Sequence, residues 1–309
     1  MEHPYRCMTM ADLETQYDAR GTVSDFDAEM RTYRSLSNSA YSNLSVIRDI
    51  AYGPGDDERI DFFPANTPNS PLFVFIHGGY WRALGRSDSA FMANSFVSMG
   101  VGVAVVEYSL APAASLGQIV DQVRRAVSHL TQNTQRLSFD AARVYLGGSS
   151  AGAHLAAMAL QPDTSELGRP IKGALLASGL YDLEPLRFCK PNDWLSLTKA
   201  IARLNSPMEL PAPVDVPLVV VWGETETTEF KRQSQDFTAK VSQAGGSVIE
   251  FEVPNRNHFD VIADLADPET RLFRTAIDMI NAPEKVVSPK SRLHHDKRPS
   301  RPRGSASWS

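Results

Sequence analysis

The segment Gly148-Ser149-Ser150-Ala151-Gly152 places a serine at the centre of a glycine-flanked motif. It follows a β-rich run at residues 143–146 and precedes a helical pattern at 151–160. A strand-to-helix turn of this kind holds the central serine on a strained, exposed corner, and glycines flank it because larger side chains would collide. The motif predicts Ser150 as a nucleophile for acyl transfer, with Ser149 as a bystander. The alternative is a helix start built from small residues.

A second motif, His77-Gly78-Gly79-Tyr80-Trp81, follows the apolar run at residues 72–76. Consecutive glycines let backbone N–H groups approach a developing negative charge, and this loop supplies part of the oxyanion hole in folds with a serine elbow. The N–H of Ala151, at a helix N-terminus, is the second source of donors. We therefore predict an oxyanion hole formed by Gly78, Gly79 and Ala151. A plain Gly-Gly turn is the alternative, and His77 is expected to order the loop.

A serine nucleophile needs a general base, and the base needs an orienting acid. Of the seven histidines, His258 follows the β-rich run at 247–253 in a polar loop, Asn255-Arg256-Asn257-His258-Phe259. This is where a serine–acid–histidine chain order places the base. His154 lies one turn into the helix after Ser150, where packing is the expected role. Of the other histidines, His77 stands in the glycine loop, and His129 lies on a predicted helix. His3, His294 and His295 lie near the chain ends.

Glu226 is the predicted acid, because it comes three residues after Gly223 at the end of the apolar run 218–222. No aspartate occurs in that loop, so a glutamate must serve there. Three other carboxylates stay open as alternatives. Glu224 and Glu229 are close in sequence, and Asp182 follows the preceding β-rich run.

Eight β-rich runs alternate with helical patterns along the chain. The predicted strands cover residues 45–52, 59–63, 72–76, 101–108, 143–146, 171–177, 218–222 and 247–253. The predicted helices cover 87–99, 116–131, 151–160, 229–243 and 268–280, with one or two surface helices within 9–37. Several strands are almost wholly apolar, as expected when helices cover both sheet faces. The alternation predicts an α/β fold with an eight-stranded, mostly parallel, doubly wound sheet whose first two strands are hairpin-like.

The composition is that of a globular protein, with 42% hydrophobic and 22% charged residues. No apolar run approaches the roughly 20 residues of a membrane span, and the N-terminus lacks a secretory pattern. The two cysteines, Cys7 and Cys189, are far apart, which argues against a disulfide framework or a zinc cluster. We expect a cytoplasmic protein that contacts no membrane and uses neither cofactor nor metal.

Charge is distributed unevenly. From residue 284 onward there are seven Lys/Arg against two acidic residues, so this tail carries +5, and because the total is −5 residues 1–283 carry −10. The Pro- and Ser-rich tail, 284–309, is predicted to be disordered. The acidic body argues against nucleic acid as a partner. We expect a single domain at 1–283, with a small cap segment at about 181–210, where the strand–helix alternation is interrupted.

The sequence resembles the arylformamidase (kynurenine formamidase-like) branch of the α/β-hydrolases over most of residues 10–280. The resemblance rests on His77-Gly78-Gly79-Tyr80-Trp81, on Ser178-Gly179-Leu180-Tyr181-Asp182-Leu183, on the acidic and polar stretch 226–234, and on Asn257-His258-Phe259. It implies an α/β-hydrolase fold, with Ser150 as nucleophile, Glu226 as acid and His258 as base. The elbow reads GGSSAG where the family pattern reads GHSAG. This departure beside the nucleophile leaves the substrate open.

The resemblance implies a serine hydrolase that removes a formyl or short acyl group from an aromatic amine through an acyl-enzyme. Its partner is then a small aromatic amide or ester, with a homodimer left open. The alternatives are a general carboxylesterase on short acyl esters, an N-acylanthranilate hydrolase rather than a kynurenine formamidase, and a non-catalytic ligand-binding protein on the same scaffold. Metal-dependent hydrolysis is disfavoured, since no His/Asp cluster has ligand spacing.

The substrate pocket is expected to be aromatic. Tyr80 and Trp81 adjoin the oxyanion loop and are candidates to stack on an aryl ring, with Trp194 and Phe188 contributing from the cap. For each of these, ordinary packing is the alternative. Arg82, or Arg187 in the cap, is a candidate to meet a carboxylate of an anthranilate or kynurenine type.

Overall fold

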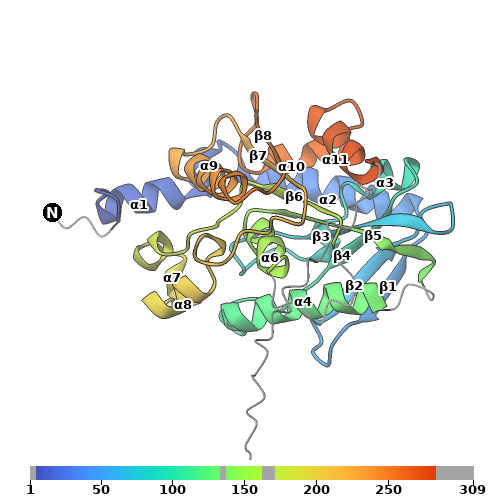
Figure 1. Cartoon of the computed structure of the whole chain (residues 1–309), viewed down its shortest axis with the longest axis horizontal. Coiled ribbons are helices and arrows are strands. Elements are labelled where there is room, and N and C mark those ends of the chain that lie inside the picture. The colour runs from blue at the N-terminus through green and yellow to red at the C-terminus, as the bar shows by residue number, and fades with distance from the viewer. Residues whose placement is uncertain (1–4, 133–136, 162–170, 283–309) are drawn as a thin grey trace, which may run out of the picture.

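The computed structural model describes residues 5–132, 137–161 and 171–282. Its strands form an eight-stranded sheet in the order β1-β2-β4-β3-β5-β6-β7-β8 (Figure 1). The strands are β1 (Ile47–Ala51), β2 (Arg59–Phe63), β3 (Ser70–Ile76), β4 (Gly102–Val106), β5 (Phe139–Ser149), β6 (Gly173–Ala177), β7 (Leu218–Gly223) and β8 (Val248–Val253). β2 is antiparallel to β1 and β4, and the remaining neighbours are parallel. The predicted eight-stranded, mostly parallel sheet is confirmed.

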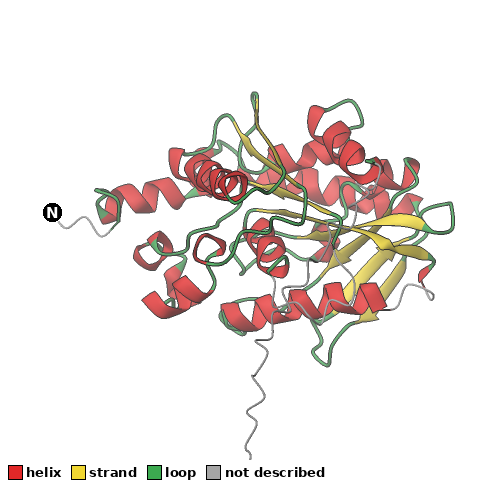
Figure 2. Cartoon of the chain, viewed as in Figure 1, coloured by secondary structure: helices red, strands yellow, loops and turns green. Residues whose placement is uncertain are grey.

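Helices cover both faces of this sheet (Figure 2). They are α1 (Met10–Tyr17), α2 (Phe26–Asn43), α3 (Ala93–Ser98), α4 (Leu116–Gln132), α6 (Ala151–Ala159), α7 (Asn192–Leu195), α8 (Lys199–Leu204), α9 (Thr228–Gln243), α10 (Asp260–Ala263) and α11 (Arg271–Asn281). Short 3-10 helices are η1 (Ala19–Thr22), η2 (Arg86–Asp88), η4 (Pro185–Phe188), η5 (Pro207–Glu209) and η6 (Asp264–Ala266). In the described part of the chain, no helix is both long and apolar enough to cross a membrane.

The central strand β3 explains why its sequence is apolar without interruption. Leu72, Val74 and Ile76 pack with residues of α4, α6 and α9 in one core. Phe73 and Phe75 point to the opposite face and pack with α2, α3 and α11. Successive strand side chains alternate between faces, so a sheet covered on both sides needs apolar residues at every position.

The predicted extent of one helix is wrong. Residues 87–99 were predicted as one helix, but the structure has η2 and then α3, separated by an irregular turn. The N–H of Ala90 donates to Ser37 Oγ at 3.1 Å. An uninterrupted helix would need that N–H for its own i→i−4 bond. The contact from α2 therefore diverts the chain at this point.

The N-terminal helices α1 and α2 each pack on the protein through one stripe of buried residues. A capping box between Thr9 and Asp12 starts α1. Beyond it Leu13 and Tyr17 are buried in the core beneath α9, and Tyr17 Oη donates to Glu229 Oε2 at 2.9 Å. On α2, Tyr33 is buried as well. The prediction of surface helices within 9–37 is confirmed, because only two residues of α1 and four of α2 are buried. Each helix buries one stripe and exposes the rest, as a surface helix does.

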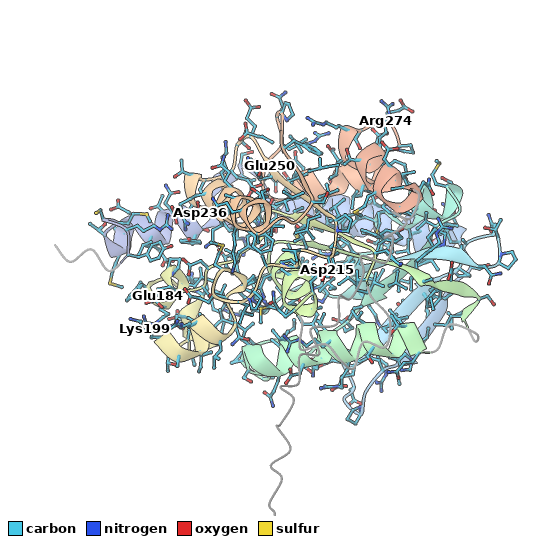
Figure 3. All side chains as sticks on the ribbon, in the orientation of Figure 1. Glu184, Lys199, Asp215, Asp236, Glu250 and Arg274 are labelled. Atoms are coloured by element: carbon cyan, nitrogen blue, oxygen red, sulfur yellow. The ribbon has the colours of Figure 1, made fainter. Side chains whose placement is uncertain are left out.

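Residues 181–210 contain η4, α7, α8 and η5, and lie next to α1 and α6 (Figure 1). Glu184 and Lys199 point outward from this segment (Figure 3). The inner side is held by His154 of α6, whose Nε2 lies 2.7 Å from the carbonyl oxygen of Asn205. Burial lowers the pKa of His154 to about 4, so its ring is neutral at neutral pH. The packing role expected for His154 agrees with these contacts. The tail 284–309, with His294 and His295, lies outside the described residues, as does His3.

Candidate active site

Ser150 lies at the junction of β5 and α6, with φ 56° and ψ −119°. Its N–H donates to the carbonyl oxygen of Ala177 on β6 at 2.8 Å, which ties the turn to the sheet. Gly152 allows α6 to pass close to β3, because a Cβ there would lie 2.0 Å from the carbonyl oxygen of Ile76. The left-handed φ of Ser150 is costly for a residue with a side chain and persists only where the surroundings enforce it. The predicted strand–serine–helix turn is present.

His258 is presented by the loop between β8 and α10. Asn257 orders this loop, because its Oδ1 accepts from the N–H groups of Phe259 at 2.7 Å and Asp260 at 3.0 Å. From α2, Tyr33 Oη donates to the carbonyl oxygen of Phe259 at 2.6 Å. The imidazole packs against the ring of Phe230, with centroids 4.3 Å apart. Hydrogen bonds thus hold the backbone next to His258, and Phe230 packs against its ring.

Glu226 contacts this histidine directly. Its Oε2 lies 2.8 Å from His258 Nδ1, and its side chain is wholly buried. Its Oε1 accepts from Ser178 Oγ and from the Gly223 N–H, both at 2.6 Å. A buried carboxylate needs such partners to stay ionised. The three donors hold both oxygens in one orientation.

The other candidate acids have different partners. Asp182 accepts from Tyr5 Oη at 2.6 Å and from the N–H of Glu184 at 3.0 Å. Glu224 accepts from the N–H of Asn255 at 2.8 Å. Glu229 pairs with Arg232 at 2.8 Å. In the described residues, Glu226 is therefore the acid that the structure brings to His258.

The hydrogen bond to Glu226 determines what His258 can do. A carboxylate only accepts, so Nδ1 of His258 carries the proton. Nε2 is then left with its lone pair, which is the form required of a general base. Ser150 and His258 line the same pocket. The arrangement can remove a proton from a serine hydroxyl and later return it to a leaving group.

The loop after β3 is held in a conformation suited to binding an oxyanion. Gly79 has φ 93°, and a Cβ there would lie 2.2 Å from the carbonyl oxygen of Ala83. In the described part of the chain, no protein acceptor takes the N–H of Gly78 or Gly79. The loop carbonyls point away, since Tyr108 Oη donates to those of His77 at 2.8 Å and Gly78 at 3.2 Å. Two N–H groups are thus left for a ligand.

His77 helps to hold this loop, as expected. Its Nε2 lies 3.3 Å from Glu107 Oε1 and its Nδ1 lies 3.0 Å from the Gly78 carbonyl oxygen. The ring stacks on Tyr108, with centroids 4.1 Å apart. Burial acts to raise the pKa of Glu107, but the hydrogen bond from His77 and the charge of Arg86 outweigh it and lower that pKa. The contacts of Tyr108 and Glu107 with this loop were not predicted from the sequence.

A pocket of about 550 Å³ opens over these groups. Its floor includes Gly78, Gly79, Ser149, Ser150 and His258. The walls are mainly apolar and aromatic: Tyr17, Phe26, Met30, Tyr33, Phe75, Tyr80, Leu84, Phe91, Trp194, Phe259 and Ile262. Tyr80 and Trp194, two of the four predicted aromatic residues, are among them. Such a cavity fits a small aromatic ligand.

The prediction that Trp81 lines the pocket is wrong. Its side chain is wholly buried and is not part of the pocket wall. The indole N–H donates to His154 Nδ1 at 3.2 Å. A buried indole must satisfy its N–H, and this bond directs the ring toward α6 rather than the cavity. Trp81 therefore links the glycine loop after β3 to α6.

Several pocket residues were not expected from the sequence. Tyr17, Phe26, Met30 and Tyr33 come from the N-terminal helices, more than a hundred residues from Ser150. Their amphipathic pattern was visible, but nothing local indicated which element they would cover. From the cap, Arg187 pairs with Glu184 and does not line the pocket, nor does Phe188. In the described residues, no group of three His, Cys, Asp or Glu side chains has the arrangement of a metal site.

Ser178 is a further residue whose role emerged only from the structure, and it can be tested. Replacing it by alanine removes one of three donors to Glu226, so we expect kcat/KM to fall about 10-fold, the effect of losing a hydrogen bond to a charged group. Ser95→Ala is the control, because Ser95 also has a buried hydroxyl, which donates to the Ala266 carbonyl oxygen, and neither residue lines the pocket. The measurement is kcat/KM of the two purified variants. Equal values of kcat/KM would count against a role of Ser178 in holding Glu226.

Comparisons with known proteins give a consistent result. The BD-FAE family model matches residues 60–175. A kynurenine formamidase from Salmo salar is 36% identical over 277 residues, 86% of this chain and 93% of the relative. One from Danio rerio is 32% identical over 291 residues, 89% of this chain and 98% of the relative. A crystal structure provisionally described as a thioesterase, from Silicibacter sp., has a TM-score of 0.77 at 27% identity, covering 85% of this chain and 98% of that one.

Proposed function

Because this chain belongs to the kynurenine formamidase family of α/β-hydrolases, we propose that it hydrolyses the N-formyl amide of an aromatic amine such as N-formylkynurenine. The observation that carries the proposal is the Glu226–His258 hydrogen bond on one side of the pocket that Ser150 lines. A buried acid–histidine pair beside a strained serine is the constellation that acyl transfer to serine requires. The aromatic pocket walls suit an aryl amide.

The first half of the reaction forms a tetrahedral intermediate. His258 Nε2 takes the proton of the Ser150 hydroxyl as Oγ bonds to the formyl carbon. The carbonyl oxygen becomes an oxyanion, which the N–H groups of Gly78, Gly79 and Ala151 stabilise. Preorganised donors of this kind contribute more in a dry pocket than in water, on the order of 3 kcal/mol each. The buried carboxylate of Glu226 stabilises the positive charge that forms on His258.

The second half releases both products. His258 gives its proton to the arylamine nitrogen as the C–N bond breaks, and the formyl group stays on Ser150. Water then enters, loses a proton to His258 and attacks the formyl carbon. Formate leaves, and Ser150 recovers its proton. An aromatic amine is a better leaving group than an alkyl amine, so the triad needs no further activation.

One alternative has an observation in its favour. The structural relative that is 27% identical is provisionally described as a thioesterase, which favours an acyl ester or thioester as the alternative substrate. A short-chain carboxylesterase would use the same three residues. A non-catalytic ligand-binding role is disfavoured, because such proteins usually lack a member of the triad. A cytoplasmic location, a homodimer and the absence of nucleic-acid and membrane partners stay predictions.

Substrate comparison tests the proposal. We expect kcat/KM for N-formylkynurenine to exceed that for N-acetyl and longer N-acyl analogues by at least 10-fold, because a formyl group leaves the oxyanion loop unhindered. The panel adds N-formylanthranilate and p-nitrophenyl acetate, each measured on purified enzyme. Turnover of the activated ester alone would replace the formamidase proposal with the carboxylesterase alternative.

A further inference from the structure

The pocket carries charged side chains that the triad does not use. Glu14, Asp18, Arg20, Arg82 and Lys190 all contribute to its lining. They come from three segments: α1 with η1, the loop after Gly79, and the cap. Arg20, Arg82, Lys190 and Asp18 are exposed, whereas Ser150 and His258 are 6% and 4% exposed. The chemistry therefore lies at the floor of the pocket and the charges at its mouth.

Each of two arginines at the mouth lies against an aromatic ring that itself lines the pocket. The guanidinium of Arg82 lies 4.7 Å from the ring centroid of Trp194, and that of Arg20 lies 4.0 Å from the ring centroid of Phe26. Both rings line the pocket. In the described residues neither arginine has a carboxylate partner. By contrast, four partly buried arginines are paired with acids: Arg86, Arg187, Arg232 and Arg256.

Stacking prepares Arg82 to bind an anion. A guanidinium lying on a ring keeps its N–H edge available, and that edge matches a carboxylate with two parallel hydrogen bonds. The backbone N–H of Arg82 donates to the carbonyl oxygen of Gly79 at 3.0 Å. The arginine thus belongs to the same turn as the predicted oxyanion hole. A carboxylate bound by Arg82 would stand at a set distance from the reacting acyl group.

Acidic groups accompany these cations. Glu14 Oε2 accepts from the N–H of Lys190 at 2.7 Å, and Asp18 Oδ1 accepts from the N–H of Gly21 at 3.0 Å. Each carboxylate keeps a second oxygen that can accept from a ligand. The mouth therefore offers an arginine fork for a carboxylate and two carboxylates for an ammonium.

We propose that the mouth of the pocket binds the α-amino-acid head group of the substrate, with Arg82 on its carboxylate and Glu14 and Asp18 toward its ammonium. This inference rests on the proposed function and narrows its substrate class. In N-formylkynurenine the head group is separated from the formamide by the aryl ring and a short chain, as the separation of mouth and floor requires. In N-formylanthranilate the carboxylate is beside the amide and there is no ammonium, so it would leave the charged mouth empty.

The test is Arg82→Gln, assayed on N-formylkynurenine and on formanilide, which has no head group. A contact remote from the bond that breaks contributes to ground state and transition state alike, so its loss raises KM and spares kcat. We expect KM for N-formylkynurenine to rise about 10-fold, the effect of one charged hydrogen-bonding group at an accessible site. For formanilide, kcat/KM should stay within about twofold of wild type.

Arg271→Gln is the matched control. Arg271 is also exposed, and its guanidinium lies 3.9 Å from the ring centroid of Phe251, but neither residue lines the pocket. Unchanged kinetics of this variant on both substrates support the assignment to Arg82. If Arg82→Gln slows both substrates equally, Arg82 orders the loop and head-group binding is overturned. Unchanged KM for N-formylkynurenine overturns it as well. If wild-type enzyme turns over neither formamide, the proposed function fails instead.

Discussion

Replacing Ser150 by alanine is expected to lower kcat by about 10⁵-fold or more, because nucleophile and base act as a unit and little remains once either is lost. The change removes a single oxygen atom and leaves the left-handed backbone as it is, so the variant should fold. Circular dichroism and the thermal midpoint check folding, and single-turnover assays on N-formylkynurenine check the rate.

Ser149→Ala is the control for this result. Ser149 precedes the nucleophile, ends β5 and also lines the pocket. Its substitution should change kcat by less than about 10-fold, as expected for a wall residue that forms no bond to the acyl group. Labelling with a fluorophosphonate gives an independent measurement, since only a chain with an activated serine should gain the adduct mass. Rates near wild type for Ser150→Ala would remove Ser150 from the mechanism.

Replacing Glu226 by glutamine should lower kcat by about 10³- to 10⁴-fold, because it changes which nitrogen of His258 carries the proton. In the wild type Oε1 accepts from two donors, Ser178 Oγ and the Gly223 N–H. The glutamine carbonyl would take that position, because an amide NH₂ cannot accept. Its NH₂ would then face Nδ1 of His258 and donate to it. Nε2 would carry the proton and lose its ability to accept one from Ser150.

The other acids provide the controls for Glu226→Gln. Glu224→Gln changes an exposed carboxylate in the same loop, and Asp182→Asn changes the rival acid, which bonds to Tyr5. Both should keep kcat within about 10-fold of wild type, since neither contacts His258. The pH dependence of kcat/KM on formanilide is measured for all three. A larger loss for Asp182→Asn than for Glu226→Gln would transfer the role of acid to Asp182.

Much of the site could be predicted because its key features are local. Gly148 beside the serine turn reflects a close approach of backbones within the motif itself, because a Cβ on Gly148 would lie 2.4 Å from the carbonyl oxygen of Gly152. The apolar run of β3 reflects the alternation of side chains between two covered faces. Such constraints act through neighbours in sequence, so residue types record them directly. The serine turn, the glycine loop, the histidine loop and the eight strands all belong to this class.

Other features depended on contacts between distant segments. Glu226, Glu224 and Asp182 are all carboxylates that follow strands, and only the docking of the loops after β7 and β8 brings one of them to His258. Trp81 was expected in the pocket wall, but its N–H found a partner on α6 instead. The N-terminal helices line the pocket because α1 packs against α9 and the cap, and α2 packs against η2 and α3. These arrangements depend on burial summed over many residues, which no local pattern encodes. The sequence by itself determined the chemistry of the site, and the tertiary structure determined which residues surround it.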